Sequence, residues 1–354
     1  MSDATDAYTI ETATPEEEPA VRELLRAMIG ETPITRWSEP FWGWKHRRSP
    51  FGPSYVGVAR SRREGDRVVS VQHAMPWTLH TPEGEAVPAT RPCDGSTYPE
   101  HQRKGLYTRI DRRTEEDLRE RGVRLFFDTP NPLTLGRNMK TGWRIAGRLP
   151  QYWAPVHSLA TLRALVRGSG PAEPAAPPES PGGARFPTWE GLLERFGPQV
   201  EEVAAAHEAG RTRVGLRTPR SPEYLRWRYG AIPTVGYRTF FTAQGEELRG
   251  FVVWRAAAGK RGLPTAIVTE LFLREPSAQE AAALLQDLRR HLGAGYVLTY
   301  FPEGTMEHAA LRRAGFWKVP RQRRIVTTKP LLPAGGEGGP EPSWDLTLGE
   351  LEVF

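Results

Sequence analysis

The stretch Gln102-Arg103-Lys104-Gly105-Leu106-Tyr107 decides the fold of this chain. It follows a strand-like run and opens a helical pattern from Leu106 to Arg121. A strand, a basic turn and a helix point several backbone N–H groups at one place, and the helix dipole adds positive potential there. Arg103 and Lys104 add full charges, and Gly105 has no Cβ to block a close approach. The turn is predicted to seat a diphosphate; the alternative is a basic helix start that is merely solvated.

The segments that follow the helix extend this pattern. An apolar strand, 123–127, leads into Asp128-Thr129-Pro130-Asn131, and a short helix then ends at Lys140-Thr141-Gly142-Trp143. This order of elements, over roughly residues 8–157, resembles the core of the GNAT N-acyltransferase superfamily. The opening at 41–50 and the exit after Trp143 resemble its tandem, Eis-like branch.

The resemblance implies acetyl-CoA, or another acyl-CoA, as cosubstrate, and no metal. In that family the turn cradles the pyrophosphate. Asn131 is a candidate to orient the pantetheine or the thiolate; the alternative is a simple turn residue between two prolines. The chain departs from the family at Tyr107, where Gly or Ala is usual. Only the backbone N–H is needed there, so the departure is tolerable if the side chain turns away. The cofactor-binding residues implied in this way are Gln102, Arg103, Lys104, Gly105, Leu106, Tyr107 and Asn131.

Composition sets broad limits. The 354 residues favour two domains, and a hydrophobic content of 38% with 11 Trp supports a sizeable core. The single Cys93 excludes a disulfide framework within the chain and a cysteine-rich zinc site. No apolar run is long enough for a membrane span, and residues 1–6 lack the pattern of a signal peptide. A cytoplasmic protein without a membrane partner is expected. The formal net charge of +6 favours anionic ligands.

The second half of the chain repeats the first. Residues 41–50 match 224–233, and in each copy a tryptophan, Trp44 or Trp227, stands six residues before a proline. Each copy is followed by two strand-like segments, and each ends on a glycine and an aromatic residue. The second copy lacks the basic glycine turn, because Arg274-Glu275-Pro276-Ser277-Ala278 stands in its place. It is therefore interpreted as a degenerate copy that shapes the acceptor side.

These observations predict an α/β (α+β) chain of two tandem GNAT-like domains, each with a mixed, mostly antiparallel sheet flanked by helices. Strands near 143–148 and 151–159 would close the first sheet. The expected domains are 1–165, with the phosphate turn, and 186–330, the degenerate copy. A linker rich in Pro, Gly and Ala at 166–185 separates them, and 331–354 is a flexible stretch with a terminal strand.

Candidates for proton transfer are few. The resemblance places a tyrosine, as acid for the leaving thiolate, at the position of Asn138, which cannot take that role. Asp94 precedes the phosphate turn, and it is either catalytic or a turn-capping aspartate beside Gly95. His73 lies on a strand that borders the acceptor in this fold, and it is either a base or a structural histidine. Cys93 is interpreted as a buried structural residue.

The end of the chain adds a third candidate. Residues 344–354 are too apolar for a frayed terminus, and the glycine-rich stretch before them would let them reach back. By resemblance to Eis-like enzymes, the carboxylate of Phe354 is a candidate base, and the side chains of Glu350 and Glu352 are further candidates. The alternative is an ordinary strand packed on the second domain.

Three functions remain open. The first is an N-acyltransferase that moves an acyl group, most simply acetyl, from CoA to the amine of a small molecule by direct attack. The second is a tandem GNAT protein that takes an aminoacyl group from charged tRNA, with which the basic clusters on 112–121 and 318–324 are compatible. The third is a non-catalytic CoA-binding protein. The oligomeric state and the acceptor are not fixed by the sequence.

Overall fold

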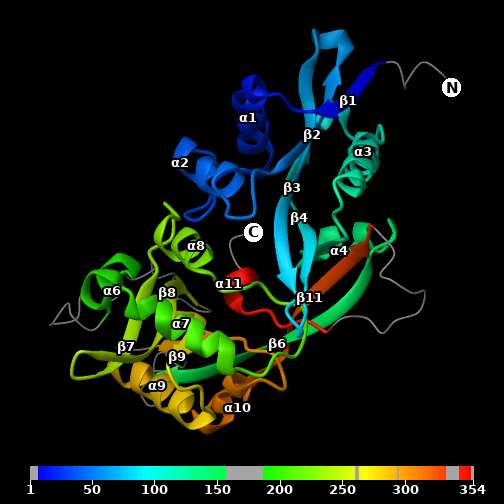
Figure 1. Cartoon of the computed structure of the whole chain (residues 1–354). Helices are drawn as coiled ribbons and strands as arrows, with labels where there is room; N and C mark the ends of the chain where they lie inside the picture. The colour runs from blue at the N-terminus through cyan, green and yellow to red at the C-terminus, as the bar shows by residue number, and fades with distance from the viewer. Residues whose placement is uncertain (1–6, 157–185, 260–262, 293–294, 332–342, 352–354) are drawn as a thin grey trace. The chain divides into compact units, whose positions relative to one another are not determined.

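The computed structural model describes residues 7–156, 186–259, 263–292, 295–331 and 343–351 (Figure 1). These residues form two compact units. Unit 1 holds the described residues up to 146 together with 326–331. Unit 2 holds those from 147 to 325 together with 343–351.

Unit 1 is a mixed sheet with helices against it (Figure 1). Its strand order is β1-β2-β3-β4-β5-β11, and only the β4–β5 pair is parallel among the pairs whose register is described. The strands are β1 (Tyr8–Thr12), β2 (Tyr55–Ser61), β3 (Arg67–His80), β4 (Ala86–Thr97), β5 (Leu125–Asp128) and the end of β11 (Trp317–Pro330). The helices are α1 (Glu18–Ile29), α2 (Glu39–Trp42), α3 (Leu106–Glu120) and α4 (Pro132–Asn138), with 3-10 turns η1 (Pro15–Glu17), η3 (Arg62–Glu64) and η4 (Pro99–His101).

The core of unit 1 follows from helical spacing. The apolar positions of α1 recur every three or four residues, so one face of the helix can be buried. Val21, Leu24 and Leu25 are buried against the loop residue Trp37 and against Val58 and other residues of the sheet. On α3, Leu106 and Ile110 pack in the same way against β1, β2 and β3. This packing fixes the start of α3 against the sheet.

Unit 2 repeats the arrangement. Its strand order is β6-β10-β9-β8-β7, and again the one parallel pair among these described registers, β9–β10, lies inside an antiparallel sheet. The helices α9 and α10 lie side by side on one face (Figure 1) and contribute to a large buried cluster of unit 2. The strands are β6 (Arg144–Val156), β7 (Arg238–Gln244), β8 (Glu247–Ala258), β9 (Pro264–Leu273) and β10 (Gly295–Thr299). The helices are α6 (Trp189–Phe196), α7 (Gln199–Gly210), α8 (Pro222–Leu225), α9 (Ala278–His291), α10 (Met306–Arg313) and α11 (Leu348–Leu351).

The sequence repeat has a structural counterpart. In unit 1, α2 continues directly into a π-helical turn, η2 (Gly43–Arg47), and in unit 2 α8 continues into another, η5 (Arg226–Gly230). The strand that follows the turn, β2 in unit 1 and β7 in unit 2, carries a register shift against the next strand. The shift lies after Ala59 in β2 and after Thr242 in β7. A π-helical turn is rare and is often found at functional sites. Its recurrence at matched positions makes the repeat a property of the fold.

The predicted fold class is confirmed: the chain is mixed α/β with mostly antiparallel strands flanked by helices. One detail differs. The two strands expected at 143–148 and 151–159 form a single strand, β6, up to Val156. Pro150 lies inside β6, because the φ angle that proline fixes is compatible with extended backbone. The other predicted domain boundaries stay predictions. Within the described residues, no helix is long and apolar enough to cross a membrane.

Candidate active site

The predicted phosphate turn lies at the start of α3. Gly105 is the N-cap of this helix with φ 72°, a left-handed conformation that glycine adopts without strain. The Gln102 side-chain amide donates to the Thr97 carbonyl over 3.0 Å, which ties the turn to the end of β4. The Lys104 ammonium donates to the Tyr8 hydroxyl over 3.0 Å. Arg103 is exposed. The first amides of α3, a helix of 15 residues, have no partner within the helix, and the positive end of its dipole lies at this turn.

A pocket of about 350 Å³ opens beside this turn, between β4 and β5. The two strands pair in parallel at Ala89–Leu125 and Thr90–Phe126, and the pocket is lined by residues that come later in both. A sheet that separates in this way leaves room for a ligand between its strands. The lining residues are Ile29, Gln72, Pro92, Cys93, Asp94, Gly95, Tyr107, Asp111, Asp128, Thr129, Pro130, Asn131, Thr134, Arg137, Asn138 and Trp143.

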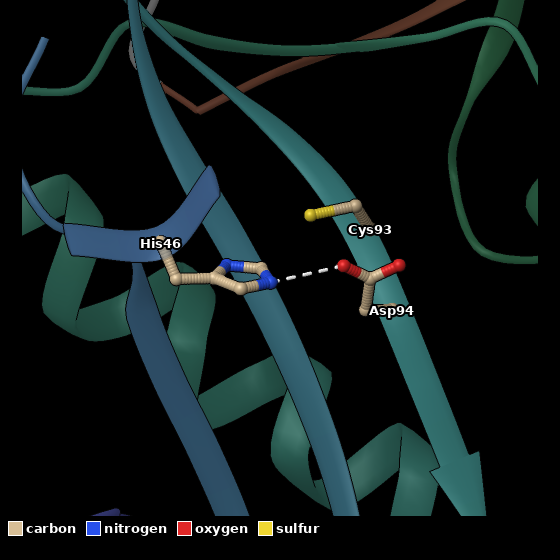
Figure 2. A group of neighbouring side chains, drawn as sticks. All are labelled: His46, Cys93 and Asp94. Atoms are coloured by element: carbon tan, nitrogen blue, oxygen red, sulfur yellow. Dashed lines mark hydrogen bonds and ion pairs between the residues drawn. The ribbon is translucent and has the colours of Figure 1, made fainter. Parts of the chain in front are cut away.

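Asp94 connects the pocket wall to the π-helical turn η2. One of its carboxylate oxygens accepts from the Lys45 ammonium at 2.7 Å and faces His46 Nε2 at 3.0 Å. Figure 2 shows the second oxygen on the side away from His46. Asp94 has φ 43°, which is unusual for a residue other than glycine, and a register shift of the β3–β4 pair lies next to it. The π-helical turn and the irregular strand together aim this carboxylate.

Electrostatics fix the charges of this cluster. Burial alone would raise the pKa of Asp94, but the Lys45 ammonium and His46 lower that pKa well below its usual range. Burial lowers the pKa of His73 to about 3, with His46 adding to the effect. The His73 ring is fully buried, and its Nδ1 lies 2.8 Å from the Asp94 carbonyl oxygen. Asp94 is therefore a fixed anion and a weak base at neutral pH, and His73 is a neutral residue behind it.

The cluster does not suit a metal ion. His46, Cys93 and Asp94 bring one ligand atom each within 4.8 Å of one another (Figure 2). However, the Lys45 ammonium already neutralises the Asp94 carboxylate. Burial also raises the pKa of the Cys93 thiol to about 12, so this sulfur is not a ready thiolate. We assign no metal-binding role to these residues.

The structure brings together several of the residues named from the sequence. Asp94, Tyr107 and Asn131 line one pocket, whereas residues 102–106 of the turn are not part of its lining. Asn131 is also the N-cap of α4, where its side-chain oxygen accepts from the Thr134 amide over 2.9 Å. His73 does not line the pocket but supports it. Phe354 lies outside the described residues.

Four pocket features were not anticipated from the sequence. The Tyr107 side chain does not turn away from the pocket, and Asp111, Asp128 and Arg137 line it as well. Burial raises the pKa of both Asp111 and Asp128. The spacing of Tyr107 and Asp111 on one helical face could have indicated a shared wall, since residues four apart are neighbours on a helix. Arg137 gave no such signal, because only folding brings α4 to this site.

Comparison with known proteins bears on the fold. Residues 9–146 match the sequence model of the acetyltransferase (GNAT) domain family. No curated protein sequence matches the chain. Among solved structures, a probable N-acyltransferase from Enterococcus faecalis is similar with a TM-score of 0.63 and 14% identity, over 92% of this chain and 73% of that one.

Two further structures show the same fold. Eis1 from Mycobacterium abscessus is similar with a TM-score of 0.52 and 15% identity, over 92% of this chain and 73% of that one. Saccharomyces cerevisiae N-myristoyltransferase with bound myristoyl-CoA is similar with a TM-score of 0.54 and 10% identity, over 91% and 79%. At these identities the likeness establishes the fold. The chain therefore has a GNAT-type fold, and its N-terminal part matches a GNAT domain.

Proposed function

We propose that the protein is a tandem GNAT N-acyltransferase of the Eis-like kind. It transfers an acyl group, most simply acetyl, from acyl-CoA to the amine of a small-molecule acceptor by direct attack in a ternary complex. The observation that carries the proposal is the pocket between β4 and β5, which begins at the basic helix start of α3. Tyr107, in the first turn of α3, is part of its wall. A diphosphate at the turn and a thioester arm in the pocket would then belong to one ligand.

The donor would be held by the start of α3. Backbone amides of the turn and the helix dipole favour the pyrophosphate, and Arg103 adds an exposed positive charge. The pantetheine would pass between the separated strands, where Asn131 offers an amide. A fold neighbour, the Saccharomyces cerevisiae N-myristoyltransferase, was solved with bound myristoyl-CoA.

The acceptor amine would approach Asp94. Its second carboxylate oxygen faces away from His46, and a fixed anion there can accept a hydrogen bond from an amine and orient its lone pair. His73 would hold Asp94 in place through the backbone. Asp111 and Asp128 are better proton acceptors than Asp94, because their pKa values are raised. Phe354 stays a candidate base from the sequence alone.

The test is a calorimetric titration of the full chain with acetyl-CoA. We expect micromolar binding that weakens at least tenfold in Arg103→Glu, because that substitution places a negative charge beside the pyrophosphate. Arg112→Glu is the matched control, since it makes the same charge change at an exposed position later on α3. No binding by the wild-type protein would refute the proposal and bring charged tRNA forward as donor. Binding without turnover would indicate a CoA-binding protein.

A further inference from the structure

The reaction proposed above needs an acid. When an amine displaces CoA from a thioester, the sulfur leaves with the bonding electron pair and must gain a proton. The donor has to hold its proton at neutral pH and stand in the pocket. Asp94 is held as an anion, which excludes it. Cys93 keeps its proton, but the neighbouring Asp94 carboxylate opposes the formation of a thiolate there.

Tyr107 meets the requirement. It is half-buried on the pocket wall, and burial raises the pKa of its phenol to about 12. Its hydroxyl end lies against β4: a Cβ built on Gly95 would stand 3.2 Å from the Tyr107 Oη. This contact is tight, so even an alanine at this position would require the phenol to shift slightly. The hydroxyl thus reaches the strand next to Asp94.

Arg137 would favour the transfer. Its guanidinium carbon stands 3.8 Å from the centre of the Tyr107 ring, and the charge of Arg137 opposes the effect of burial on the phenol pKa. A cation beside the phenol stabilises the phenolate that remains after the proton has left. The Asp111 and Asp128 carboxylates act in the other direction and add to the effect of burial on the phenol pKa.

We propose that Tyr107 is the catalytic acid that protonates the departing thiolate, with Arg137 stabilising its phenolate. This inference rests on the proposed function. A single acid at Tyr107 would also explain two departures of this sequence from the family pattern. Asn138 stands where a tyrosine is expected, Tyr107 stands where Gly or Ala is expected, and both line the same pocket.

The amine nitrogen attacks the thioester carbon, a C–N bond forms, and a pocket carboxylate takes the amine proton. The C–S bond then breaks, and the Tyr107 O–H transfers its proton to sulfur, which gives free CoA and a phenolate. The carboxylic acid returns its proton to the phenolate through water. The net change is amine plus acyl-CoA to amide plus CoA.

The experiment compares Tyr107→Phe with the wild-type full chain. Thiol release from acetyl-CoA is followed with a thiol reagent, and hydroxylamine serves as the amine probe. Phenylalanine keeps the ring between Gly95 and Arg137 and removes only the hydroxyl. We expect kcat to fall about 100-fold or more. The KM and Kd for acetyl-CoA should stay within about twofold, a division that loss of packing alone would not give.

Two further variants make the result decisive. Tyr296→Phe removes a hydroxyl in unit 2 and should leave kcat unchanged. Tyr107→Ala distinguishes an acid from a steric plug: if it binds acetyl-CoA at least tenfold more tightly with kcat unchanged, Tyr107 only obstructs the pocket and the inference fails. Wild-type kcat in Tyr107→Phe also overturns it, while the proposed function stands. Failure of the wild-type protein to bind acetyl-CoA, or binding without turnover, would overturn both.

Discussion

The two copies of the fold differ in the surroundings of one carboxylate, which in each copy contacts the π-helical turn. In unit 1 the fourth residue of the π-helical turn, His46, meets a carboxylate on β4, Asp94, and this carboxylate borders an open pocket. In unit 2 the fourth residue of the corresponding turn, Tyr229, donates to a carboxylate on β9, Glu270, over 3.1 Å. A segment of the chain, 343–351, which is buried from Trp344 onward, occupies the space next to Glu270. The link between turn and strand is shared, but only one copy leaves the carboxylate open to a ligand.

The segment in unit 2 is held by buried charges. Arg220 donates to Glu350 at 2.9 Å and pairs with Glu270 at 3.1 Å, and Thr347 donates to Glu270 over 2.9 Å. Near the start of the segment, the Arg211 guanidinium donates to the Asp345 carboxylate over 2.8 Å. A buried ion network contributes little net stability, but it fixes one arrangement strongly. The comparison shows how one repeat can keep a binding pocket while its copy becomes a support for the chain.

Removing a charge from the network in unit 2 should have the largest effect. Arg220→Ala leaves Glu270 and Glu350 buried without their common partner. We expect the free energy of unfolding to fall by about 3–5 kcal/mol in chemical denaturation. Arg226→Ala, which removes an exposed arginine paired with Glu201, is the control and should cost less than about 1 kcal/mol. Equal costs would mean that the segment is not held by its charges.

The pH dependence of stability should differ between the carboxylate of Glu270 in unit 2 and that of Asp94 in unit 1. Burial raises the pKa of Glu270 from 4.5 to about 7, against the effect of Arg220. The folded chain therefore holds a proton that the unfolded chain releases between about pH 4.5 and pH 7, so stability falls as pH rises through this window. Its slope is at most about 1.4 kcal/mol per pH unit. The difference in unfolding free energy between wild type and Glu270→Gln should show this slope, and a flat difference would contradict it.

Asp94 should behave in the opposite way. Its folded pKa is depressed, so its contribution is present above the unfolded value of about 4 and is lost only as pH falls toward the folded value. The difference between wild type and Asp94→Asn should therefore be constant above about pH 5 and shrink in acid. Denaturation at a series of pH values measures it. A difference that instead shrinks between pH 5 and 7 would show that Asp94 shares the behaviour of Glu270.

Two glycines test packing against backbone strain. A Cβ on Gly349 would overlap the Tyr229 hydroxyl and stand 2.6 Å from Glu270 Oε1, so Gly349→Ala should cost about 1–3 kcal/mol. Gly105→Ala meets no atom within 4 Å of the added Cβ among the described residues. It should cost only the left-handed strain, about 1 kcal/mol. Thermal or chemical unfolding of both variants measures these losses of stability. A larger loss in Gly105→Ala than in Gly349→Ala would contradict the prediction.

The smallest effect is expected at two matched helix caps. Asn131 caps α4, and Thr305 caps α10, where its hydroxyl accepts from the His308 amide over 3.2 Å. Replacing either with Ala should cost about 1 kcal/mol of stability. Only Asn131→Ala should also weaken acetyl-CoA binding in the calorimetric titration, because only Asn131 lines the open pocket. Equal donor affinity in both variants would restrict Asn131 to its capping role.

Much of the fold could be predicted from local sequence patterns. The apolar spacing of α1 and α3 specified buried faces, and the repeated Trp-to-Pro segments specified two copies of one unit. The open pocket was predictable only in part. Asp94 was a candidate because it precedes the basic turn, and Asn131 because of the family resemblance. Lys45 and His46 were not candidates, since their role depends on a strand about 50 residues away.

The sequence by itself determined the class of fold, the repeat and the position of the basic turn at the start of α3, because these depend on periodicity and on residues close together in the chain. Tertiary structure decided the rest. It turned Tyr107 into the pocket, placed Arg137 over its ring and put segment 343–351 beside Glu270. The physical reason is that proton affinity and access depend on burial and on charges that only folding brings within a few ångströms.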